Sequence, residues 1–536
     1  MLQEAWWKRG IIYEIYARSF QDSNDDGIGD LNGIRERLDY LTWLGVDAVW
    51  ISPIFPSPMA DFGYDISNYC DIDPVFGTLT DFDALLKEAH RRGLKIILDY
   101  VPNHTSDEHP WFAESRSSRN NAKRHWYIWR DGKPGGLPPN NWVSQFAGSA
   151  WTFDPDTNQY YLHSFLSKQP DLNWRNREVR EAMFQVLRFW LDRGVDGFRV
   201  DVAWLLIKDA ALRDNPLNPD FRATQPAINR YLSLYNADQP EIHDLIAQMR
   251  AVLDAYSDRI LIGEIYLPFS RLVTYYGQNL MGAHLPFNFA LIHAAWRAQE
   301  IATLIMDYEK ALPPGGWPNW VLGNHDQPRV AARVGAAQAR NAAMLLLTLR
   351  GTPTMYYGDE LGLARVSVPP EFAKDPWAKN EPGIGVSRDP CRTPFQWTGA
   401  ANAGFTTGRP WLPLDPDYRT QNVECLQHDH HSLPGLYHRL IEIRKRHRAL
   451  SIGDARVISA DDDVLIYERS HGSEKLVIAL NFAPESRRLS APQLTASSMV
   501  LSTSMDREEM ASDLKLRGNE GAIFVLSPQD RSGAGA

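Results

Sequence analysis

Short apolar runs rich in β-branched and aromatic residues recur along this chain, separated by segments with helical periodicity. This alternation is typical of repeated β-α units, whose strands pair in parallel. Eight runs are present, at Ile11–Ala17, Val46–Ser52, Leu94–Tyr100, Val195–Val200, Ile260–Gly263, His284–Phe289, Trp320–Gly323 and Pro353–Tyr357. Because eight such units close a barrel, the sequence predicts an α/β fold built on a (β/α)8 TIM barrel.

Two of the intervening segments carry clear helix signals. After the second strand, a helix is predicted to begin at Thr80, with Asp83 completing a capping box, and to end near Gly93. Before the fourth strand, a helix is predicted to end at Gly194. The apolar face of that second helix is formed by Val179, Met183, Val186, Leu187 and Trp190.

The pattern also divides the chain into three predicted domains. The catalytic barrel is expected over residues 1–103 and 174–455. The interval after the third strand is too long for a simple connection and is rich in Pro, Gly, Asn and Trp, so residues 104–173 are expected to form an inserted lobe. After about residue 455 the apolar runs become short and alternating, which predicts a C-terminal antiparallel β-sandwich over 456–536.

Composition limits the kind of partner. The formal net charge is −10 and Lys and Arg do not cluster, so neither a nucleic acid nor a membrane surface is expected as a partner. The expected ligand is small and neutral, and the chain is expected as a monomer or homodimer. The three cysteines, Cys70, Cys391 and Cys425, lie far apart without metal-ligand or redox spacing. A cytoplasmic location is therefore expected.

Polar residues follow four of the predicted strands, at the rim where barrels of this kind place their active sites. Singly, an Asp after a strand is more often a helix N-cap, and a lone His is more often a satisfied polar residue. Four groups on one rim favour a functional site instead. The residues are Asp99 and His104 after the third strand, Arg199 and Asp201 at the fourth, Glu264 after the fifth, and His325 and Asp326 after the seventh.

Asp201 and Glu264 have the residue types needed to cleave a glycosidic bond. That reaction needs one carboxylic acid to protonate the leaving oxygen and one carboxylate to attack the anomeric carbon, about 5–5.5 Å apart in a retaining mechanism. Arg199 points to the same side of its strand as Asp201 and can keep it ionised. Glu264 must carry a proton, so its pKa has to be raised by burial or by neighbouring carboxylates.

These four blocks, in this order, resemble the α-amylase superfamily, glycoside hydrolase family 13. The segment Gln169–Asn173 resembles the block that marks the oligo-1,6-glucosidase and α-glucosidase branch. The segments Asp61–Ile66 and Arg388–Trp397 are similar to the same branch. The resemblance covers nearly the whole chain and implies a retaining α-glucosidase that releases terminal non-reducing α-D-glucose from short α-glucosides, with transglucosylation as a side reaction.

The resemblance also implies roles for individual residues. Asp201 is expected as the nucleophile, Glu264 as the acid/base, and Asp326 as the carboxylate that binds sugar hydroxyls and favours the distorted transition state. Asp61 and Arg392 are expected to close the pocket around the non-reducing end. The remaining expected substrate-binding residues are Tyr64, His104, Phe146, Phe165, Arg199 and His325, while Asp99 is expected to support the rim.

An acidic loop after the first strand carries oxygen ligands on alternate residues, the spacing that a hard cation needs. It begins like an EF-hand loop, but its twelfth position is Gly33 and a strand precedes it. The loop resembles the structural metal site of family α-glucosidases, so Ca²⁺ or Mg²⁺ is expected and no organic cofactor; the alternative is a solvated acidic turn. The expected ligands are Asp22, Asn24, Asp26, the carbonyl of Ile28, and Asp30.

Linkage preference is less constrained. Val202, after the expected nucleophile, resembles the residue common in α-1,6-acting members, yet Ala203 and Trp204 depart from that pattern. Isomaltose, maltose, trehalose and sucrose are all candidate substrates. The segment after Asp326 lacks the arginine-rich stretch of sucrose isomerases. A trehalose-synthase-like or other glucosyl transferase is the alternative function, and a non-catalytic relative of the transporter-associated kind is a weaker one.

Overall fold

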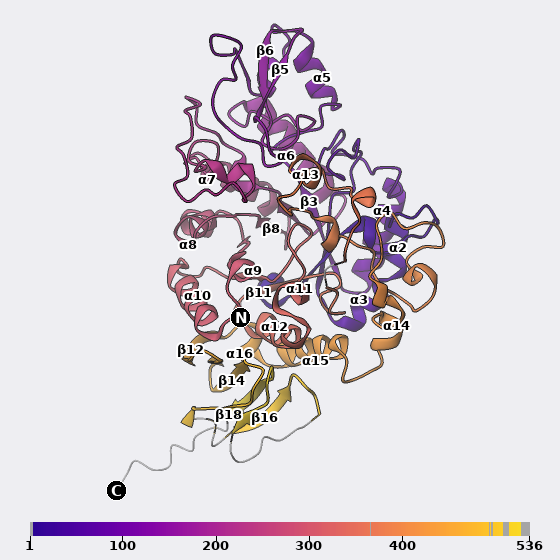
Figure 1. The fold of residues 1–536 in the computed structure, drawn as a ribbon, viewed down its shortest axis with the longest axis vertical. Helices are drawn as coiled ribbons and strands as arrows, with labels where there is room; N and C mark the ends of the chain where they lie inside the picture. The colour runs from indigo at the N-terminus through magenta and orange to yellow at the C-terminus, as the bar shows by residue number, and fades with distance from the viewer. Residues whose placement is uncertain (1–3, 365, 493, 495–496, 507–513, 527–536) are drawn as a thin grey trace.

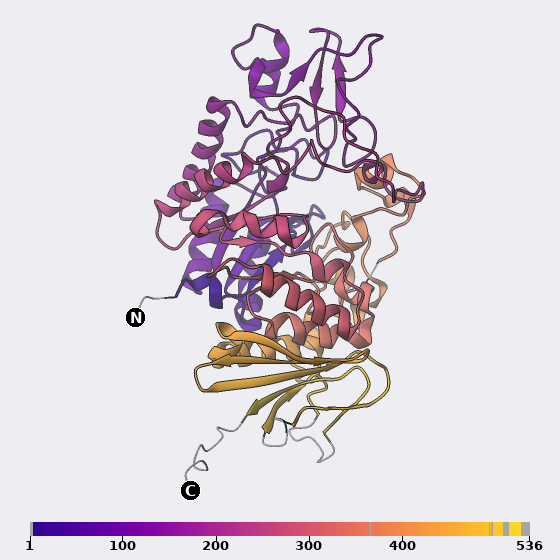
Figure 2. The ribbon, with the colours of Figure 1, turned by 90° about the vertical axis from the view of Figure 1, so that its left-hand side faces the viewer.

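The computed structural model describes residues 4–364, 366–492, 494, 497–506 and 514–526. In Figure 1 a lobe that contains β5, β6 and α5 lies at the top, the barrel lies in the middle, and the C-terminal sheet lies at the bottom. Figure 2 shows the same three layers from the side, with the C-terminal sheet packed under the barrel helices. The limits between the three predicted domains stay predictions.

Eight parallel strands form the barrel sheet, in the order β10-β11-β1-β2-β3-β7-β8-β9. A parallel bridge between Asn288 and Trp320 joins the region of β9 to that of β10, so the barrel is nearly closed. Each strand overlaps one of the predicted runs, and the TIM barrel is confirmed. The strands are β1 (Ile12–Ile15), β2 (Ala48–Ile51), β3 (Lys95–Tyr100), β7 (Gly197–Val200), β8 (Ile260–Gly263), β9 (Leu285–Pro286), β10 (Asn319–Val321) and β11 (Thr352–Tyr356).

The barrel strands are apolar because both of their faces are buried. Alternate residues of one strand point to opposite sides of the sheet. Thus Trp50 lies in the core that fills the barrel, together with Ile12, Ile97 and Ile262. Its neighbour Val49 lies in the larger core between the sheet and the surrounding helices. The strands therefore read as continuous apolar runs, which is the pattern that identified them.

Helices cover the outside of the barrel, and none in the described ranges is long and apolar enough to cross a membrane. Figure 1 shows α8 and α10 on one side of the barrel and α2, α3 and α4 on the other. The barrel helices are α2 (Leu31–Glu36), α3 (Leu38–Leu44), α4 (Leu79–Arg91), α6 (Arg177–Asp192), α7 (Ile242–Asp254), α8 (Phe269–Leu272), α10 (Ala298–Ala311), α12 (Ala336–Thr348) and α15 (Leu433–Arg446).

The capping box predicted for α4 is wrong by two residues. The N-cap is Thr78, whose side chain accepts from the backbone N–H of Asp81 while the Asp81 carboxylate accepts from the backbone N–H of Thr78. The pattern Thr-x-x-Asp occurs twice in this stretch, and the earlier copy adds two residues to the helix. Asp83, predicted to complete the box, instead pairs with Arg193 at 3.1 Å.

The prediction for α6 is confirmed. Asn176 caps its N-terminus by accepting from the backbone N–H of Glu178, and Gly194 follows its end with φ 102°. That left-handed conformation favours glycine, because a side chain would be strained there. The five residues predicted for the apolar face, Val179, Met183, Val186, Leu187 and Trp190, are all buried.

The segment between β3 and α6 forms the lobe above the barrel. It contains α5 (Pro110–Ser117) and a three-stranded antiparallel sheet of β4 (Trp129–Arg130), β6 (Gln159–Leu162) and β5 (Trp151–Asp154), in the order β4-β6-β5. The lobe has its own small apolar core around Trp142 and Trp151. A rigid lobe at the carboxyl ends of the barrel strands can wall one side of a rim site.

The chain ends in an antiparallel sheet whose two faces bury different cores. On β13 and β14, Leu465 and Ile478 belong to the core shared with the barrel helices, whereas Ile466 and Val477 pack with Leu516. This two-faced burial confirms the predicted antiparallel domain. The strands are β12 (Asp454–Ala460), β13 (Val464–His471), β14 (Glu474–Asn481), β18 (Gly521–Leu526) and β16 (Ser497–Ser502) in that order, with a second sheet of β15 (Arg487–Arg488) and β17 (Lys515–Leu516).

Candidate active site

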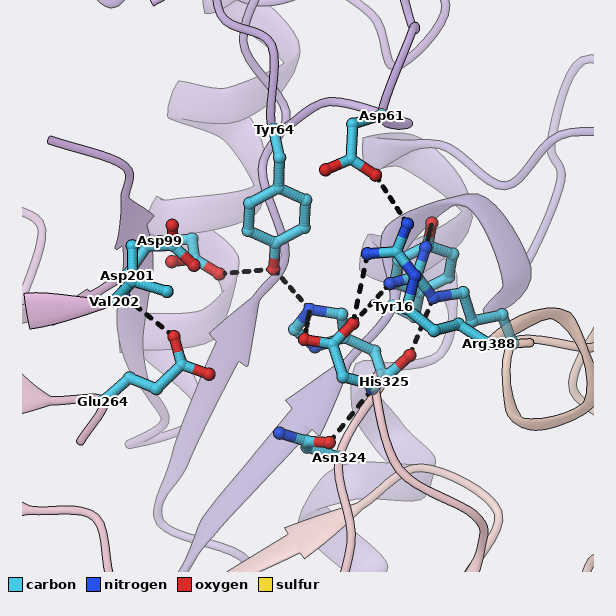
Figure 3. Close-up of polar contacts among 12 residues, drawn as sticks. Tyr16, Asp61, Tyr64, Asp99, Asp201, Val202, Glu264, Asn324, His325 and Arg388 are labelled. Carbon is cyan, nitrogen blue, oxygen red and sulfur yellow. Dashed lines mark hydrogen bonds and ion pairs between the residues drawn. The ribbon is translucent and has the colours of Figure 1, made fainter. Parts of the chain in front are cut away.

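A cavity of about 490 Å³ opens at the carboxyl ends of the barrel strands, between the rim and the lobe. Figure 3 shows its polar groups: Asp201, Val202 and Glu264 lie on one side, Asp61 and Arg388 on the other, with Tyr64 and His325 between them. The structure therefore brings the rim residues together. The predicted residues that line the cavity are Asp61, Tyr64, His104, Phe146, Phe165, Asp201, Val202, Glu264 and Asp326.

Arg199 on β7 organises the two expected catalytic carboxylates. Its side chain is fully buried, and its Nη1 donates to Asp201 Oδ1 at 2.7 Å and to Asp99 Oδ1 at 2.8 Å. Its Nη2 forms an ion pair with Glu264 Oε2 at 2.7 Å. One guanidinium thus joins the carboxyl groups of Asp201 and Glu264 and keeps both within reach of a single sugar ring. Arg199 itself lies beneath the cavity lining.

Burial controls the protonation of this pair. Desolvation raises the pKa of Asp201, Arg199 lowers it, and the charge of Glu264 raises it further. Desolvation likewise raises the pKa of Glu264, with Arg199 opposing and Asp326 adding to the rise. Two buried carboxyl groups that share one arginine favour a state that holds a proton. That state is what a mechanism with one acid and one nucleophile requires.

The turn after β7 is strained at Val202, whose φ of 36° places a β-branched residue in the left-handed region. This conformation directs the backbone N–H of Val202 to Glu264 Oε2 at 2.8 Å. The backbone N–H of Ala203 donates to the Glu264 carbonyl at 3.1 Å. The turn that carries Asp201 is therefore tied directly to the expected acid/base, and the identity of residue 202 can affect both.

His325 is held in one orientation by its neighbours. Its Nδ1 lies 2.6 Å from Glu14 Oε1, and its Nε2 lies 2.6 Å from the hydroxyl of Tyr64. The rings of Tyr64 and Tyr16 stack on it with interplanar angles of 13° and 16°. Burial holds the pKa of His325 well below its usual range. The imidazole is therefore neutral, and it holds the Tyr64 hydroxyl, whose residue lines the cavity.

Asp326 is the carboxylate that remains ionised. Burial opposes its charge, but the guanidinium charges of Arg392 and Arg388 hold the pKa of Asp326 below its ordinary value. Arg392 Nη2 donates to Asp326 Oδ1 at 2.6 Å, and Arg392 Nε donates to the His325 carbonyl at 2.7 Å. Asp326 is thus a fixed negative charge in the cavity, suited to accept hydrogen bonds from two sugar hydroxyls.

Asp61 and Arg392 are expected to close the pocket around the non-reducing end, and the structure pairs Asp61 with Arg388. Asp61 Oδ1 accepts from Arg388 Nη2 at 2.6 Å, and Arg388 also pairs with Asp375 at 2.8 Å. Arg392 is buried beneath Asp326 and is not part of the cavity lining. The two arginines flank the short 3-10 turn Asp389–Cys391, and this turn sends Arg388 towards the cavity and Arg392 below it.

The lobe contributes one wall of the cavity through two aromatic rings, and it also supplies a buried amide that contacts residues of the lining. Gln169 Nε2 lies 3.2 Å from Asp61 Oδ2 and 3.1 Å from His104 Nε2, so it links two expected sugar-binding residues. The ring of Phe165 lies 5.1 Å from that of His104 and 5.7 Å from that of Phe146. Burial lowers the pKa of His104 to about 4, so its ring is neutral.

Three of these contacts lie outside the sequence-based prediction. Glu14 is a fully buried carboxylate within β1, and a charge inside an apolar strand was the signal available for it. Gln169 begins the segment Gln169–Asn173, which marks the family branch but predicts no contact for this side chain. For Arg388, the spacing of the motif does not distinguish it from Arg392, because both arginines flank the same turn.

The acidic loop after β1 is tied by local hydrogen bonds. Asp22 Oδ1 accepts from the backbone N–H groups of Asn24 and Asp25 at 2.9 Å, and Asp26 Oδ1 accepts from that of Ile28 at 2.8 Å. Asp30 caps α2 through Gly33. Within the described residues, no group of three or more His, Cys, Asp or Glu side chains gathers in a metal-holding geometry. The donor types still suit a hard cation, so the metal stays a prediction.

Buried carboxylates joined by one arginine, at the carboxyl-terminal rim of a TIM barrel, define the class of barrel glycosidases. A family model described as the alpha amylase catalytic domain matches residues 14–453, and the chain belongs to this family. A probable alpha-glucosidase of Rhizobium meliloti is 44% identical over 91% of each chain. An oligo-1,6-glucosidase of Parageobacillus thermoglucosidasius is 37% identical over 98% of this chain and 100% of its own.

A solved structure of an alpha-glucosyl transfer enzyme superposes with a TM-score of 0.93 at 40% identity, and covers 98% of this chain and 100% of its own. Agreement at this level extends over the barrel, the lobe and the C-terminal sheet. The fold of all three parts is therefore that of the family.

Proposed function

We propose that this protein is a retaining α-glucosidase that releases one terminal α-D-glucose from short α-glucosides. The observation that carries the proposal is the cavity itself: Asp201 and Glu264 share Arg199 on one side, and the Asp61–Arg388 ion pair lies on the other. The space between them suits a single glucose ring. Because the Asp61–Arg388 ion pair closes that end of the cavity, a longer glucan chain cannot extend past it, and only a terminal glucose can be released.

In the first step Asp201 attacks the anomeric carbon while Glu264 gives its proton to the leaving oxygen, which forms a glucosyl ester on Asp201. Asp326 and His104, which line the cavity, bind the sugar hydroxyls, while His325 positions Tyr64 beside them. In the second step Glu264, now ionised, takes a proton from water, and the water oxygen displaces Asp201 from the anomeric carbon. The backbone N–H of Val202 donates to Glu264 and favours its ionised form in this second step.

Linkage preference depends on the residues around the leaving group. Val202 lines the cavity beside Glu264. Its resemblance to α-1,6-acting members, with the oligo-1,6-glucosidase among the relatives, supports isomaltose as the preferred disaccharide. Transfer to another hydroxyl differs from hydrolysis only in what attacks the ester, and the likeness to an alpha-glucosyl transfer enzyme supports transfer as a second activity.

The testing experiment measures glucose released from isomaltose, maltose, trehalose and sucrose at equal concentrations. Asp201→Ala abolishes release, whereas Asp307→Ala, a control exposed on α10, keeps it. Glucose release mainly from isomaltose would support the role of Val202 in α-1,6 preference. Release from maltose alone would contradict that role but would still support the α-glucosidase assignment. If trehalose formed from maltose without net release of glucose, the protein would be a trehalose-synthase-like transferase and the hydrolase proposal would be wrong. The α-anomer must appear first, because the mechanism retains configuration.

We also propose that the acidic loop from Asp22 to Asp30 binds Ca²⁺ or Mg²⁺ as a structural ion. Three carboxylates, one amide and one backbone carbonyl on alternate residues are the donors that such an ion prefers. The ion would stabilise the loop between β1 and α2 and would supply no catalytic group. Its test is the effect of a chelator on thermal unfolding.

A cytoplasmic location is proposed from the cysteines. Cys70, Cys391 and Cys425 are free thiols in the structure. A chain of this size that folds without disulfides suits a reducing compartment. Fractionation of the source cells tests this directly: activity confined to the extracellular fraction would contradict it.

A further inference from the structure

The cavity has two chemically different ends. One end carries the charged residues Asp61, Asp326 and Arg388, which suit the hydroxyls of glucose. The other end, beyond Asp201 and Glu264, is lined largely by apolar side chains: Val202, Trp204, Leu205, Pro226, Ile228 and Leu232. Figure 3 shows Val202 on the opposite side of the site from Asp61 and Arg388. A leaving group or an acceptor must occupy this second end, next to Glu264.

Most of this apolar wall comes from one loop, between β7 and α7. A bridge pairs Leu217 with Tyr231, and the backbone N–H of Leu232 donates to the Pro216 carbonyl at 2.9 Å. The pairing joins the arm of the loop that carries Leu217 to the facing arm that carries Leu232. Their exposed fractions are 67% and 39%, large values for leucines beside an active site.

The loop is fixed over the cavity by the segment after β11. Glu381 Oε1 accepts from the backbone N–H of Ala227 at 2.6 Å, and Glu381 Oε2 accepts from Trp377 Nε1 at 2.7 Å. Asn380, on the short helix α13 (Pro376–Asn380), donates to the carbonyl of Phe146 in the lobe at 3.0 Å. The apolar wall is therefore a built part of the site, joined to both the barrel and the lobe.

The same loop also brings the polar residues Asn218, Asn229 and Ser233 to the lining, and the side chain of Asn218 is committed to the loop. Asn218 Nδ2 donates to the Asn229 carbonyl at 2.9 Å, and Asn218 Oδ1 accepts from the backbone N–H of Asp220 at 3.0 Å. A sugar in this end would bury several hydroxyls against apolar side chains, and each hydroxyl without a partner lowers affinity. An aromatic or alkyl group would instead bury apolar surface, which is favourable.

We propose that this end is a subsite for an apolar aglycone, and that the enzyme transfers glucose to aromatic or alkyl alcohols in preference to sugars. The proposal rests on the proposed glucosidase function and adds to it the chemical class of the acceptor. The alcohol hydroxyl lies beside Glu264, and its apolar body lies against Val202, Ile228 and Leu232.

The transfer step conserves all atoms and needs no further reactant. The ester between Asp201 and the anomeric carbon breaks, and a bond between that carbon and the alcohol oxygen forms. The alcohol proton passes to the Glu264 carboxylate, which lost its own proton to the first leaving group. The product is an α-glucoside of the alcohol.

The experiment uses p-nitrophenyl α-glucoside as donor, with benzyl alcohol or glucose as acceptor at equal molarity. The ratio of transfer product to released p-nitrophenol is measured, because each p-nitrophenol released reports one glucosyl enzyme formed. We expect benzyl glucoside to exceed glucosyl-glucose by at least about fivefold. Leu232→Asn lowers the benzyl ratio by about fivefold or more, since it removes apolar contact with the acceptor.

Leu137→Asn is the matched control, an exposed leucine of the lobe that lies outside the cavity lining. It leaves the ratio unchanged, and Ile228→Ser serves as a second variant if Leu232→Asn does not fold. Equal or greater transfer to glucose in the native enzyme, or an unchanged ratio in both cavity variants, would overturn the apolar subsite. Absence of p-nitrophenol release would instead mean that the glucosidase proposal has failed.

Discussion

Arg199 contacts Asp201 through Nη1 and Glu264 through Nη2, each at 2.7 Å, so one buried cation joins the expected nucleophile and the expected acid/base. Asp99 shares Nη1 at 2.8 Å. Because one guanidinium contacts three carboxylates, its planar shape is as important as its charge for holding them in a fixed geometry. The same charge on a lysine cannot reach all three with fixed geometry.

Arg199→Lys is therefore expected to lower kcat/KM by at least about a hundredfold and to lower the melting temperature, because buried carboxylates lose a partner. Arg259→Lys is the control, since Arg259 contacts Asp196 at 3.4 Å at the opposite end of the barrel. Steady-state kinetics and thermal unfolding measure both effects. Near-native activity of Arg199→Lys would show that charge alone is sufficient.

A second prediction concerns the ion pair between Asp61 and Arg388. Asp61→Asn and Arg388→Met are each expected to raise KM for disaccharides about tenfold or more, because the first change removes a carboxylate that lines the cavity and the second leaves that carboxylate buried without its arginine. The double variant is expected to be little worse than each single one, since the two side chains act as a pair. Additive losses in this double-mutant cycle would show that the residues bind substrate independently.

Arg392→Met provides a contrast for this cycle. Arg392 contacts Asp326 at 2.6 Å and has no contact with Asp61 among the hydrogen bonds of the described chain. Its loss is expected to lower kcat through Asp326 and to show no coupling with Asp61→Asn. Strong coupling between positions 61 and 392 would show that these two side chains act together on the sugar, as the family resemblance implies.

The barrel could be predicted because its strands are buried on both faces. Runs such as Ile260–Gly263 are then continuous and apolar, and the polar residues that follow four of these runs mark the rim. The convergence of Asp201, Glu264 and Asp326 follows from topology alone, since parallel strands end at one edge.

What the sequence could not predict depends on local geometry. One 3-10 turn decides that Arg388, and not Arg392, reaches the cavity. Two overlapping copies of the pattern Thr-x-x-Asp make Thr78 and Thr80 equally good candidates for the helix cap in the sequence. The apolar wall from Pro226 to Leu232 belongs to an irregular loop, and loops without periodicity give no register from which to place a side chain.

A third prediction concerns the anchor of that loop. Glu381→Ala removes the acceptors for the backbone N–H of Ala227 and for the indole of Trp377. The loop is then expected to move, which raises KM several-fold and lowers the transfer ratio, with little effect on the melting temperature. Glu371→Ala, an exposed position in the same segment, is the control. Equal kinetics in the two variants would mean that the loop is held by other contacts.

The acidic loop gives a fourth prediction. A chelator is expected to lower the melting temperature by a few degrees while leaving kcat nearly unchanged at a temperature well below unfolding, because an ion bound only by the folded state stabilises it by mass action. Asp26→Ala is expected to abolish the chelator effect, whereas Asp25→Asn, in the same loop but not an expected ligand, preserves it. No shift in melting would leave the loop as a hydrogen-bonded turn.

The last prediction is a loss of stability in acid that involves His109. This side chain is 5% exposed, caps α5 by accepting from the backbone N–H of Trp111 at 3.1 Å, and has its pKa lowered to about 4 by burial. The unfolded chain protonates this histidine near 6.5, so the unfolded state binds more protons between about 6.5 and about 4. Stability is full above 6.5 and is lost as the pH falls through this window.

The pKa difference corresponds to as much as about 3 kcal/mol. His109→Asn keeps an acceptor for the cap and cannot protonate. It is therefore expected to reduce the fall in unfolding free energy between pH 7 and pH 4.5, measured by denaturant titration at each pH. His430→Asn, at an exposed position, is expected to leave the profile unchanged. Identical pH profiles for the native chain and His109→Asn would place the acid sensitivity elsewhere, and His104 and His284, whose pKa values burial also lowers, would be the next residues to test.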